Sequence, residues 1–142
     1  RENVFLNGAI LGMKRKEIGK KFDAIVSFSE MEKFIDTPIK HYSSGMAARL
    51  AFSVAVHLDQ PILFLDEVLA VGDTPFRNKC IEKMKSIAQS GRTLLFVSHS
   101  ESAVQALCHR CAYLKNGHLV GVGPTSQILK VYESDCLTKS AA

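Results

Sequence analysis

The pattern of apolar and polar positions divides the chain into a helical N-terminal part and a longer part in which helices and strands alternate. Apolar residues recur at helical spacing over residues 3–13 and 14–29, and a third short helix is expected over residues 31–35, before Pro38. None of these segments holds an obvious catalytic group. Residues 1–40 are therefore predicted to form a small helical subdomain.

Residues 41–142 alternate between strand-like and helix-like patterns. The continuous apolar run Ile62–Leu65 has the length of a parallel strand that is covered on both faces, and Thr93–Val97 is predicted to be a second buried strand. The dipeptide Asn116-Gly117 between apolar arms predicts a β-hairpin over residues 111–123. This order predicts an α/β fold. The helices expected around these strands span residues 46–58, 76–89, 101–107 and 125–137, and the tail from residue 138 is expected to fray.

Polar residues follow both predicted strands directly. Asp66 and Glu67 come after the first strand, and Ser98-His99-Ser100 follows the second. Adjacent carboxylates at the end of a buried strand are costly unless they hold a cation or transfer a proton. The carboxyl ends of strands are also where α/β sheets bind their ligands. A pair of solvated carboxylates and a structural histidine are the alternatives that the residues alone leave open.

A short polar turn, Tyr42-Ser43-Ser44-Gly45, precedes the helix over residues 46–58. Free backbone N–H groups and the positive end of the helix dipole make such a turn an anion site. The alternative is that Ser43 acts as an ordinary helix N-cap. Because Asp66 and Glu67 come next along the chain, phosphate recognition and metal–phosphate chemistry fall in one stretch. This combination indicates nucleotide hydrolysis.

The stretch from Tyr42 to Asp73, YSSGMAARLAF followed by LDEVLAVGD, resembles the signature motif, the Walker B strand and the D-loop of ABC-type ATPases. Its form is similar to the ATP-binding subunits of polysaccharide, O-antigen and teichoic-acid exporters, and the resemblance covers nearly the whole chain. The resemblance implies a partial P-loop NTPase sheet core with a small helical subdomain and a C-terminal β-hairpin and helix. Residues 1–40 would be the helical subdomain portion, and residues 41–142 the C-terminal part of the ATPase core.

The resemblance assigns nucleotide binding to four residues of the signature motif. They would bind the γ-phosphate of an ATP molecule held by the opposite subunit of a dimer. Ser44 and Met46 replace the glycine and glutamine of the commonest pattern, as in the exporter branch of the family. The four residues are Ser43, Ser44, Gly45 and Met46.

The resemblance also assigns roles to the residues near the strand ends. Asp66 would help to hold Mg²⁺ through a water molecule. Glu67 would polarise the attacking water as general base, and His99 would contact the γ-phosphate as the switch histidine. Asp73 matches the D-loop aspartate, which would communicate between the two sites of a dimer. Asp73 could equally cap the helix that follows it.

The function implied by this resemblance is that of an ATP-binding and ATP-hydrolysing subunit of an ABC transporter that exports polysaccharide or polyol phosphate. Its cofactors would be ATP and Mg²⁺. Its partners would be a second ATP-binding subunit and a membrane permease subunit, which would place it at the cytoplasmic face of the cell membrane. Two alternatives stay open: a truncated, non-catalytic ABC cassette that serves as a partner subunit, and a soluble ABC ATPase without a transport role.

An ABC ATPase also needs a phosphate loop, G-x-x-x-x-G-K-[ST], and the sequence contains only Gly19-Lys20 of that pattern. The sequence also starts with Arg1 rather than methionine. These features predict a fragment of a longer chain, with the phosphate loop and several strands upstream. We expect the 142 residues alone to bind ATP weakly and to be inactive as an ATPase. We also expect the incomplete sheet to leave an exposed edge.

Charge and cysteine content narrow the range of partners. The net charge is +4, and Glu17 and Asp23 interrupt the basic cluster of residues 14–21, so we expect a solvated helix face and no nucleic acid. No apolar run approaches the ~20 residues that span a bilayer. Cys108 and Cys111 have zinc-like spacing, but no second ligand pair accompanies them. We therefore expect no zinc and two small buried thiols.

Overall fold

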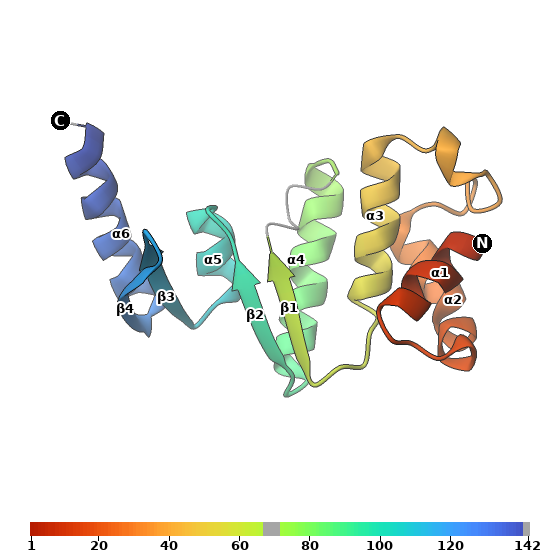
Figure 1. The fold of residues 1–142 in the computed structure, drawn as a ribbon, viewed down its shortest axis with the longest axis horizontal. Coiled ribbons are helices and arrows are strands. Elements are labelled where there is room, and N and C mark those ends of the chain that lie inside the picture. The colour runs from red at the N-terminus through yellow and green to blue at the C-terminus, as the bar shows by residue number, and fades with distance from the viewer. Residues whose placement is uncertain (67–71, 141–142) are drawn as a thin grey trace. The chain divides into compact units, whose positions relative to one another are not determined.

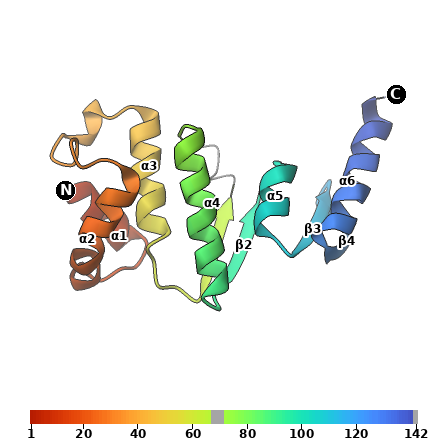
Figure 2. The same cartoon turned by 180° about the vertical axis from the view of Figure 1, so that it is seen from behind.

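The computed structural model describes the chain except for residues 67–71 and 141–142. The described residues form helices as far as residue 55 and a mixture of strands and helices after it (Figures 1 and 2). This mixed order confirms the predicted α/β class. The elements are α1 (Glu2–Ile10), α2 (Arg15–Ser29), a 3-10 helix η1 (Ile39–His41), α3 (Ser44–Ala55), β1 (Ile62–Asp66), α4 (Thr74–Gln89), β2 (Thr93–Val97), α5 (Glu101–Leu107), β3 (Arg110–Lys115), β4 (His118–Pro124) and α6 (Thr125–Ser140).

Contacts within the chain define two compact units. The first comprises residues 1–63 and 68–94, and the second comprises residues 64–67 and 95–142. The first unit therefore holds α1 to α4, and the second holds α5, the β3–β4 hairpin and α6. Strands β1 and β2 each begin in the first unit and end in the second. The predicted subdomain boundary after residue 40 stays a prediction.

The helices α1, α2 and α3 share one apolar core in the first unit. Helix α2 starts where the Glu17 carboxylate accepts the backbone N–H of Lys14 at 2.7 Å, which satisfies a donor at the helix start. Beyond that turn its apolar residues recur on one face, which packs against the other two helices. The core residues are Val4, Met13, Ile18, Ile25, Val26, Ile35, Leu50, Val54 and Leu58.

The first predicted helix is shorter than expected. Helix α1 ends at Ile10 rather than at residue 13. Gly12 follows with a left-handed backbone, φ +87°, which a helix cannot continue. Met13 is still buried in the core. The periodic pattern therefore predicted its burial correctly, although the helix ends before it.

The third predicted helix, over residues 31–35, is wrong. Residues 32–36 form turns, and the N–H of Thr37 donates to the carbonyl of Phe34 at 2.9 Å. Met31 and Ile35 are nevertheless buried. Their four-residue spacing therefore anchors the two ends of a turn and does not mark one face of a helix.

Helices α3 and α4 each begin two residues earlier than predicted, because a polar residue caps each start. Both helices contribute to an aromatic cluster in the first unit. The Phe76 ring lies 5.8 Å from the Phe28 ring and 6.4 Å from the Phe52 ring, measured between centroids. Phe52 and Phe76 are 2% and 0% exposed. This cluster joins α2, α3 and α4.

Strands β1 and β2 pair with each other and point in the same direction in Figure 1. Leu63 and Leu65 of β1 are buried, and the alternate side chains are exposed. The prediction that β1 is covered on both faces is therefore wrong for the described residues, and so is the prediction that β2 is buried, because its side chains are half-buried or exposed. The exposed side chains are Ile62 (58% exposed), Phe64 (61%), Leu95 (51%) and Val97 (47%).

The second unit contains the predicted hairpin. Strands β3 and β4 are antiparallel and joined at Asn116-Gly117, whose φ angles of 50° and 78° suit a two-residue hairpin turn. Helix α6 packs on the hairpin through a Tyr113–Tyr132 edge-to-face contact with centroids 5.3 Å apart. Helix α6 continues to Ser140, three residues beyond the predicted end at residue 137. Residues 141–142 of the tail that was expected to fray lie outside the described residues.

Candidate nucleotide site

Ser43 is the N-cap of α3. Its backbone is extended, and its Oγ accepts the N–H of Met46 at 3.2 Å. Because this bond uses an oxygen lone pair, the hydroxyl hydrogen can still donate to an anion. Ser44 and Gly45 lie in the first helical turn, where backbone N–H groups have no partner within the helix. The four signature residues are therefore together at one helix start, and the capping role of Ser43 is confirmed.

Asp73 caps α4, which was one of the two roles expected for it. Its Oδ1 accepts the N–H of Phe76 at 3.1 Å and lies 2.8 Å from Nη2 of Arg49 on α3. The hydrogen bond from the Phe76 N–H has the larger effect and the charge of Arg49 the smaller one, and both hold the pKa of the Asp73 carboxyl below its usual value. The preceding Gly72 has φ +81°, and a Cβ there would lie 3.0 Å from Cδ1 of Phe76. A larger residue would therefore disturb this corner.

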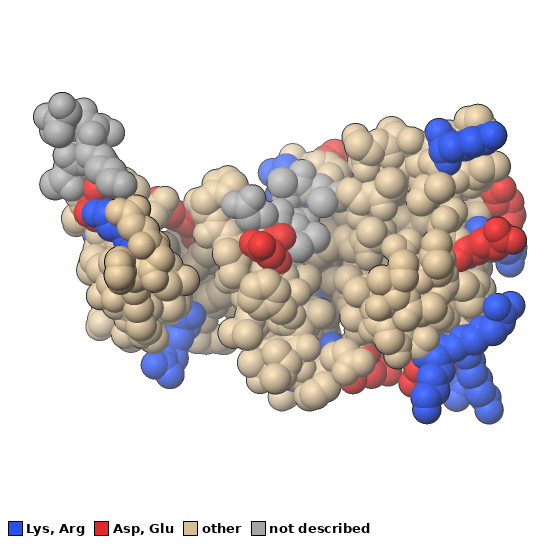
Figure 3. Space-filling view, in the orientation of Figure 1, with Lys and Arg blue, Asp and Glu red and all other residues tan. Residues whose placement is uncertain are grey.

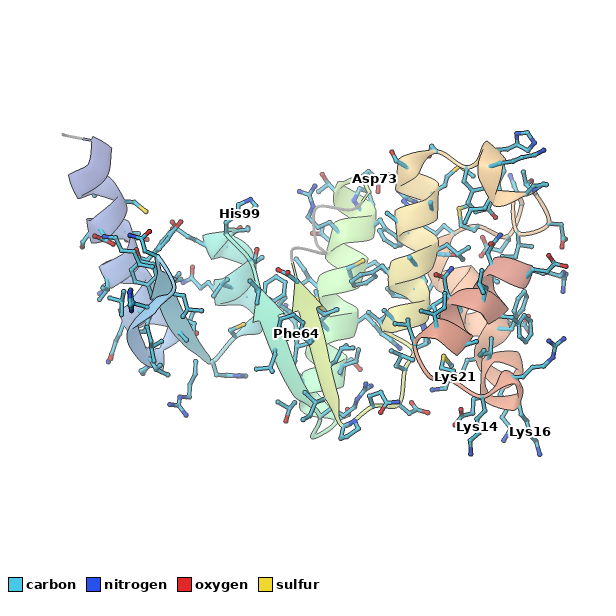
Figure 4. The ribbon with its side chains drawn as sticks, in the orientation of Figure 1. Lys14, Lys16, Lys21, Phe64, Asp73 and His99 are labelled. Atoms are coloured by element: carbon cyan, nitrogen blue, oxygen red, sulfur yellow. The ribbon has the colours of Figure 1, made fainter. Side chains whose placement is uncertain are left out.

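Asp66 and His99 lie at the carboxyl ends of neighbouring strands in the second unit. Asp66 is the last residue of β1, and His99 follows β2 by two residues. Both side chains are exposed, and His99 is labelled in Figure 4. Because β1 and β2 point the same way, both residues leave the same edge of the sheet. Glu67, the predicted general base, lies outside the described residues, and the roles of all three stay predictions.

The described residues offer few ligands for Mg²⁺. Among the described residues, no group of three or more His, Cys, Asp or Glu side chains could hold a metal ion. Asp66 offers one carboxylate, and Mg²⁺ is commonly held by one or two protein carboxylates together with substrate phosphates and water. Asp66 therefore fits the part of a Mg²⁺ ligand in a nucleotide complex.

Cys108 and Cys111 are half-buried free thiols, and burial raises the pKa of the Cys108 thiol.

Sequence reasoning missed Arg49. Its side chain is 19% exposed, and its guanidinium carbon lies 4.6 Å above the Phe76 ring. It also pairs with Glu30 at the end of α2 and with Asp73 at the start of α4, so it contacts two other helices of the first unit. The available signal was a lone charged residue within the apolar segment that forms α3.

The basic cluster near the start of α2 is mixed with acidic groups. Figure 3 shows basic side chains gathered at the lower edge of the view with acidic ones beside them, and Figure 4 labels Lys14, Lys16 and Lys21 there. Nζ of Lys21 lies 2.5 Å from the Asp59 carboxylate and donates to the carbonyl of His57 at 2.7 Å. This surface has the mixed charge of a solvated helix face. None of the described helices is long and apolar enough to cross a membrane.

The fold matches solved structures of ABC ATPases. An ATP-binding subunit of an ABC transporter superposes with a TM-score of 0.79 at 20% identity, over 93% of this chain and 55% of that chain. The dimeric structure of MJ0796, a bacterial ABC transporter cassette, gives a TM-score of 0.66 at 22% identity, over 80% of this chain and 50% of that chain. No family model matches the sequence. The fold is that of part of the ATP-binding domain in these ABC transporter structures.

Proteins of known sequence that are similar to this chain include ATP-binding proteins of export systems. The chain is 45% identical over 133 residues to the O-antigen export system ATP-binding protein RfbB of Klebsiella pneumoniae, covering 94% of this chain and 54% of the relative. It is 48% identical over 134 residues to the teichoic acids export ATP-binding protein TagH of Enterococcus faecalis, covering 94% and 30%. It therefore spans about half, or less, of the length of these relatives. Its homologues are ATP-binding proteins of O-antigen and teichoic acid export, as the motifs predicted.

Proposed function

We propose that the protein containing these residues is the ATP-hydrolysing subunit of an ABC exporter of polysaccharide or polyol phosphate. The observation that carries this proposal is the 45% identity to an O-antigen export ATP-binding protein over 94% of the chain. The Ser43-capped start of α3 supports it, because that start has the geometry of an anion site. The proposed partners are a second ATP-binding subunit and a membrane permease, so the subunit would lie at the cytoplasmic face of the membrane.

The first step of the proposed mechanism is closure of the dimer on ATP. The Ser43 hydroxyl and the N–H groups of Ser44 and Gly45 donate to the γ-phosphate of an ATP held by the opposite subunit. The positive end of the α3 dipole adds to this attraction. Each site is complete when the two subunits meet, so ATP binding favours the closed dimer.

The second step is hydrolysis at the edge of the sheet. Glu67 accepts a proton from the attacking water, and His99 donates a hydrogen bond to the γ-phosphate. Asp66 would hold Mg²⁺ through water, and the metal would neutralise charge on the phosphates. Loss of the γ-phosphate removes the ligand of Ser43, so the dimer can reopen and the cycle can act on the permease.

Replacement of Ser43 by aspartate separates its capping role from its proposed phosphate role. Aspartate caps helices as well as serine does, so the thermal stability of the full-length protein should be kept or raised. The new carboxylate would repel the γ-phosphate, because like charges ~4 Å apart near a protein surface repel by about 4 kcal/mol. We expect ATP turnover by the dimer to fall by about two orders of magnitude or more, measured as phosphate release at saturating ATP.

The matched control is Ser43→Ala, which removes the cap without adding a charge. It should cost about 1 kcal/mol of stability and reduce turnover less than Ser43→Asp does. Wild-type turnover in Ser43→Asp would show that Ser43 is a helix cap and nothing more.

A further inference from the structure

The guanidinium of Arg49 is held on three sides in the first unit. Nη1 donates to the Glu30 carboxylate at 3.1 Å, and Nη2 lies 2.8 Å from Oδ1 of Asp73. Its central carbon lies 4.6 Å above the Phe76 ring. A planar guanidinium can donate to two carboxylates along its edge while its face lies on an aromatic ring. The position of Arg49 therefore depends on both acidic residues.

Glu30 occupies an unusual backbone conformation. It is the C-cap of α2, with φ 60° and ψ 32° in the left-handed region, where glycine or asparagine is normally preferred. Its side chain gains two contacts there. One carboxylate oxygen accepts from Arg49, and the other accepts from Nζ of Lys79 at 3.2 Å. Glu30 therefore keeps a disfavoured backbone conformation while its carboxylate bridges Arg49 and Lys79. This combination indicates that the side chain itself has a role at this position.

We propose that Glu30 is a positioning residue, which holds Arg49 against Asp73 and so ties the end of α2 to the start of α4. Asp73 is the N-cap of α4 and lies beside α3 in Figure 4. Displacement of the end of α2 would pull on Arg49 and, through it, on the Asp73 corner. Gly72 makes this corner tight, because a Cβ there would lie 3.1 Å from Nε of Arg49.

One consequence rests on the proposed function. Residues 1–40 resemble the helical subdomain, and Asp73 resembles the D-loop aspartate that would communicate between the two sites of a dimer. The contacts from Glu30 through Arg49 to Asp73 would then connect the helical subdomain to the ATP sites. Lys79 also contacts Glu30, but its other contacts, the Ser27 carbonyl and the Phe28 ring, lie within α2.

The test compares Glu30→Gln, Glu30→Gly and Lys79→Met in the full-length protein. Glutamine keeps the size of the side chain and loses its charge, whereas glycine loses the carboxylate and relieves the left-handed backbone. Hydrogen exchange of the segment 72–77, which contains the capped Phe76 amide, reports how firmly the corner is held. Both Glu30 variants should exchange about three- to fivefold faster there, as expected for the loss of a partly buried ion pair. Lys79→Met should stay near wild type, because it leaves Arg49 and Asp73 paired.

The stability of Glu30→Gly makes the result specific. This variant should melt at or above the wild-type temperature, because glycine accepts the left-handed conformation, and yet show the faster exchange at residues 72–77. In an Asp73→Asn background, Glu30→Gln should give little further change, because its effect passes through Asp73. Unchanged exchange in both Glu30 variants, or full additivity with Asp73→Asn, would overturn the positioning role.

ATP turnover separates this inference from the proposed function. If the wild-type protein hydrolyses ATP, both Glu30 variants should lower kcat about threefold or more with KM for ATP within twofold, because Glu30 lies outside the proposed phosphate contacts. If the wild-type protein does not hydrolyse ATP, the proposed function fails, and the exchange result still decides the positioning role. Normal kcat in both variants together with faster exchange would remove the link to the ATP sites.

Discussion

Replacement of Glu67 by glutamine in the full-length protein is expected to reduce ATP turnover by about 10²–10⁴-fold. Glutamine has the size of glutamate but cannot accept the proton of the attacking water. ATP binding should stay near wild type or tighten, because the change removes a negative charge near the triphosphate. Phosphate release at saturating ATP measures the first effect, and equilibrium binding of labelled ATP measures the second.

A mixture of two inactive variants provides the control. In a heterodimer of Glu67→Gln and Ser43→Asp subunits, one site combines an intact Glu67 with an intact Ser43 from the other chain. Because half of randomly mixed dimers are heterodimers with one such site, turnover should recover to about a quarter of wild type. Recovery requires that Ser43 acts across the dimer. No recovery would contradict the shared site, and wild-type turnover by Glu67→Gln alone would exclude Glu67 as the base.

The elements with a strong local signal could be predicted from the sequence. The hairpin at Asn116-Gly117 was found because both turn residues must adopt positive φ, and few dipeptides accept this. The strand over residues 93–97 was placed at its observed bounds. The segment 31–35 failed because burial at a four-residue spacing is shared by helical faces and by turns with two anchors. Burial on both faces of β1 failed because composition reports what a strand can tolerate, and it does not report which neighbours the chain supplies.

The parts of the candidate site that depend on neighbouring residues along the chain could also be predicted from the sequence. Ser43 and Asp73 were recognised as possible caps because a cap depends on residues within three positions along the chain. The contacts of Arg49 join residues 19 and 24 positions away, and no short-range pattern records such pairs. Because Arg49 is a lone charged residue in an apolar helix, the sequence indicates that it has a partner but not which residue that partner is. The structure identifies those partners as Glu30 and Asp73.

Truncation of Phe76 to alanine is expected to cause a large loss of stability, about 3–5 kcal/mol. The side chain is 0% exposed, and its ring contacts those of Phe28 and Phe52. Its loss would leave a cavity where α2, α3 and α4 meet, and it would remove the surface on which Arg49 rests. Urea unfolding of the full-length protein, followed by circular dichroism, measures the change in the free energy of unfolding.

Two controls distinguish the cavity from a general effect of losing an aromatic residue. Phe34→Ala removes a ring that is 47% exposed, so the free energy of unfolding should change by less than about 1 kcal/mol. Phe76→Leu keeps most of the volume and should cost about half as much as Phe76→Ala, because it leaves a smaller cavity. Since leucine cannot offer a π face to Arg49, Phe76→Leu should still loosen the Asp73 corner in hydrogen exchange. Equal costs for Phe76→Ala and Phe34→Ala would contradict a close-packed junction of α2, α3 and α4.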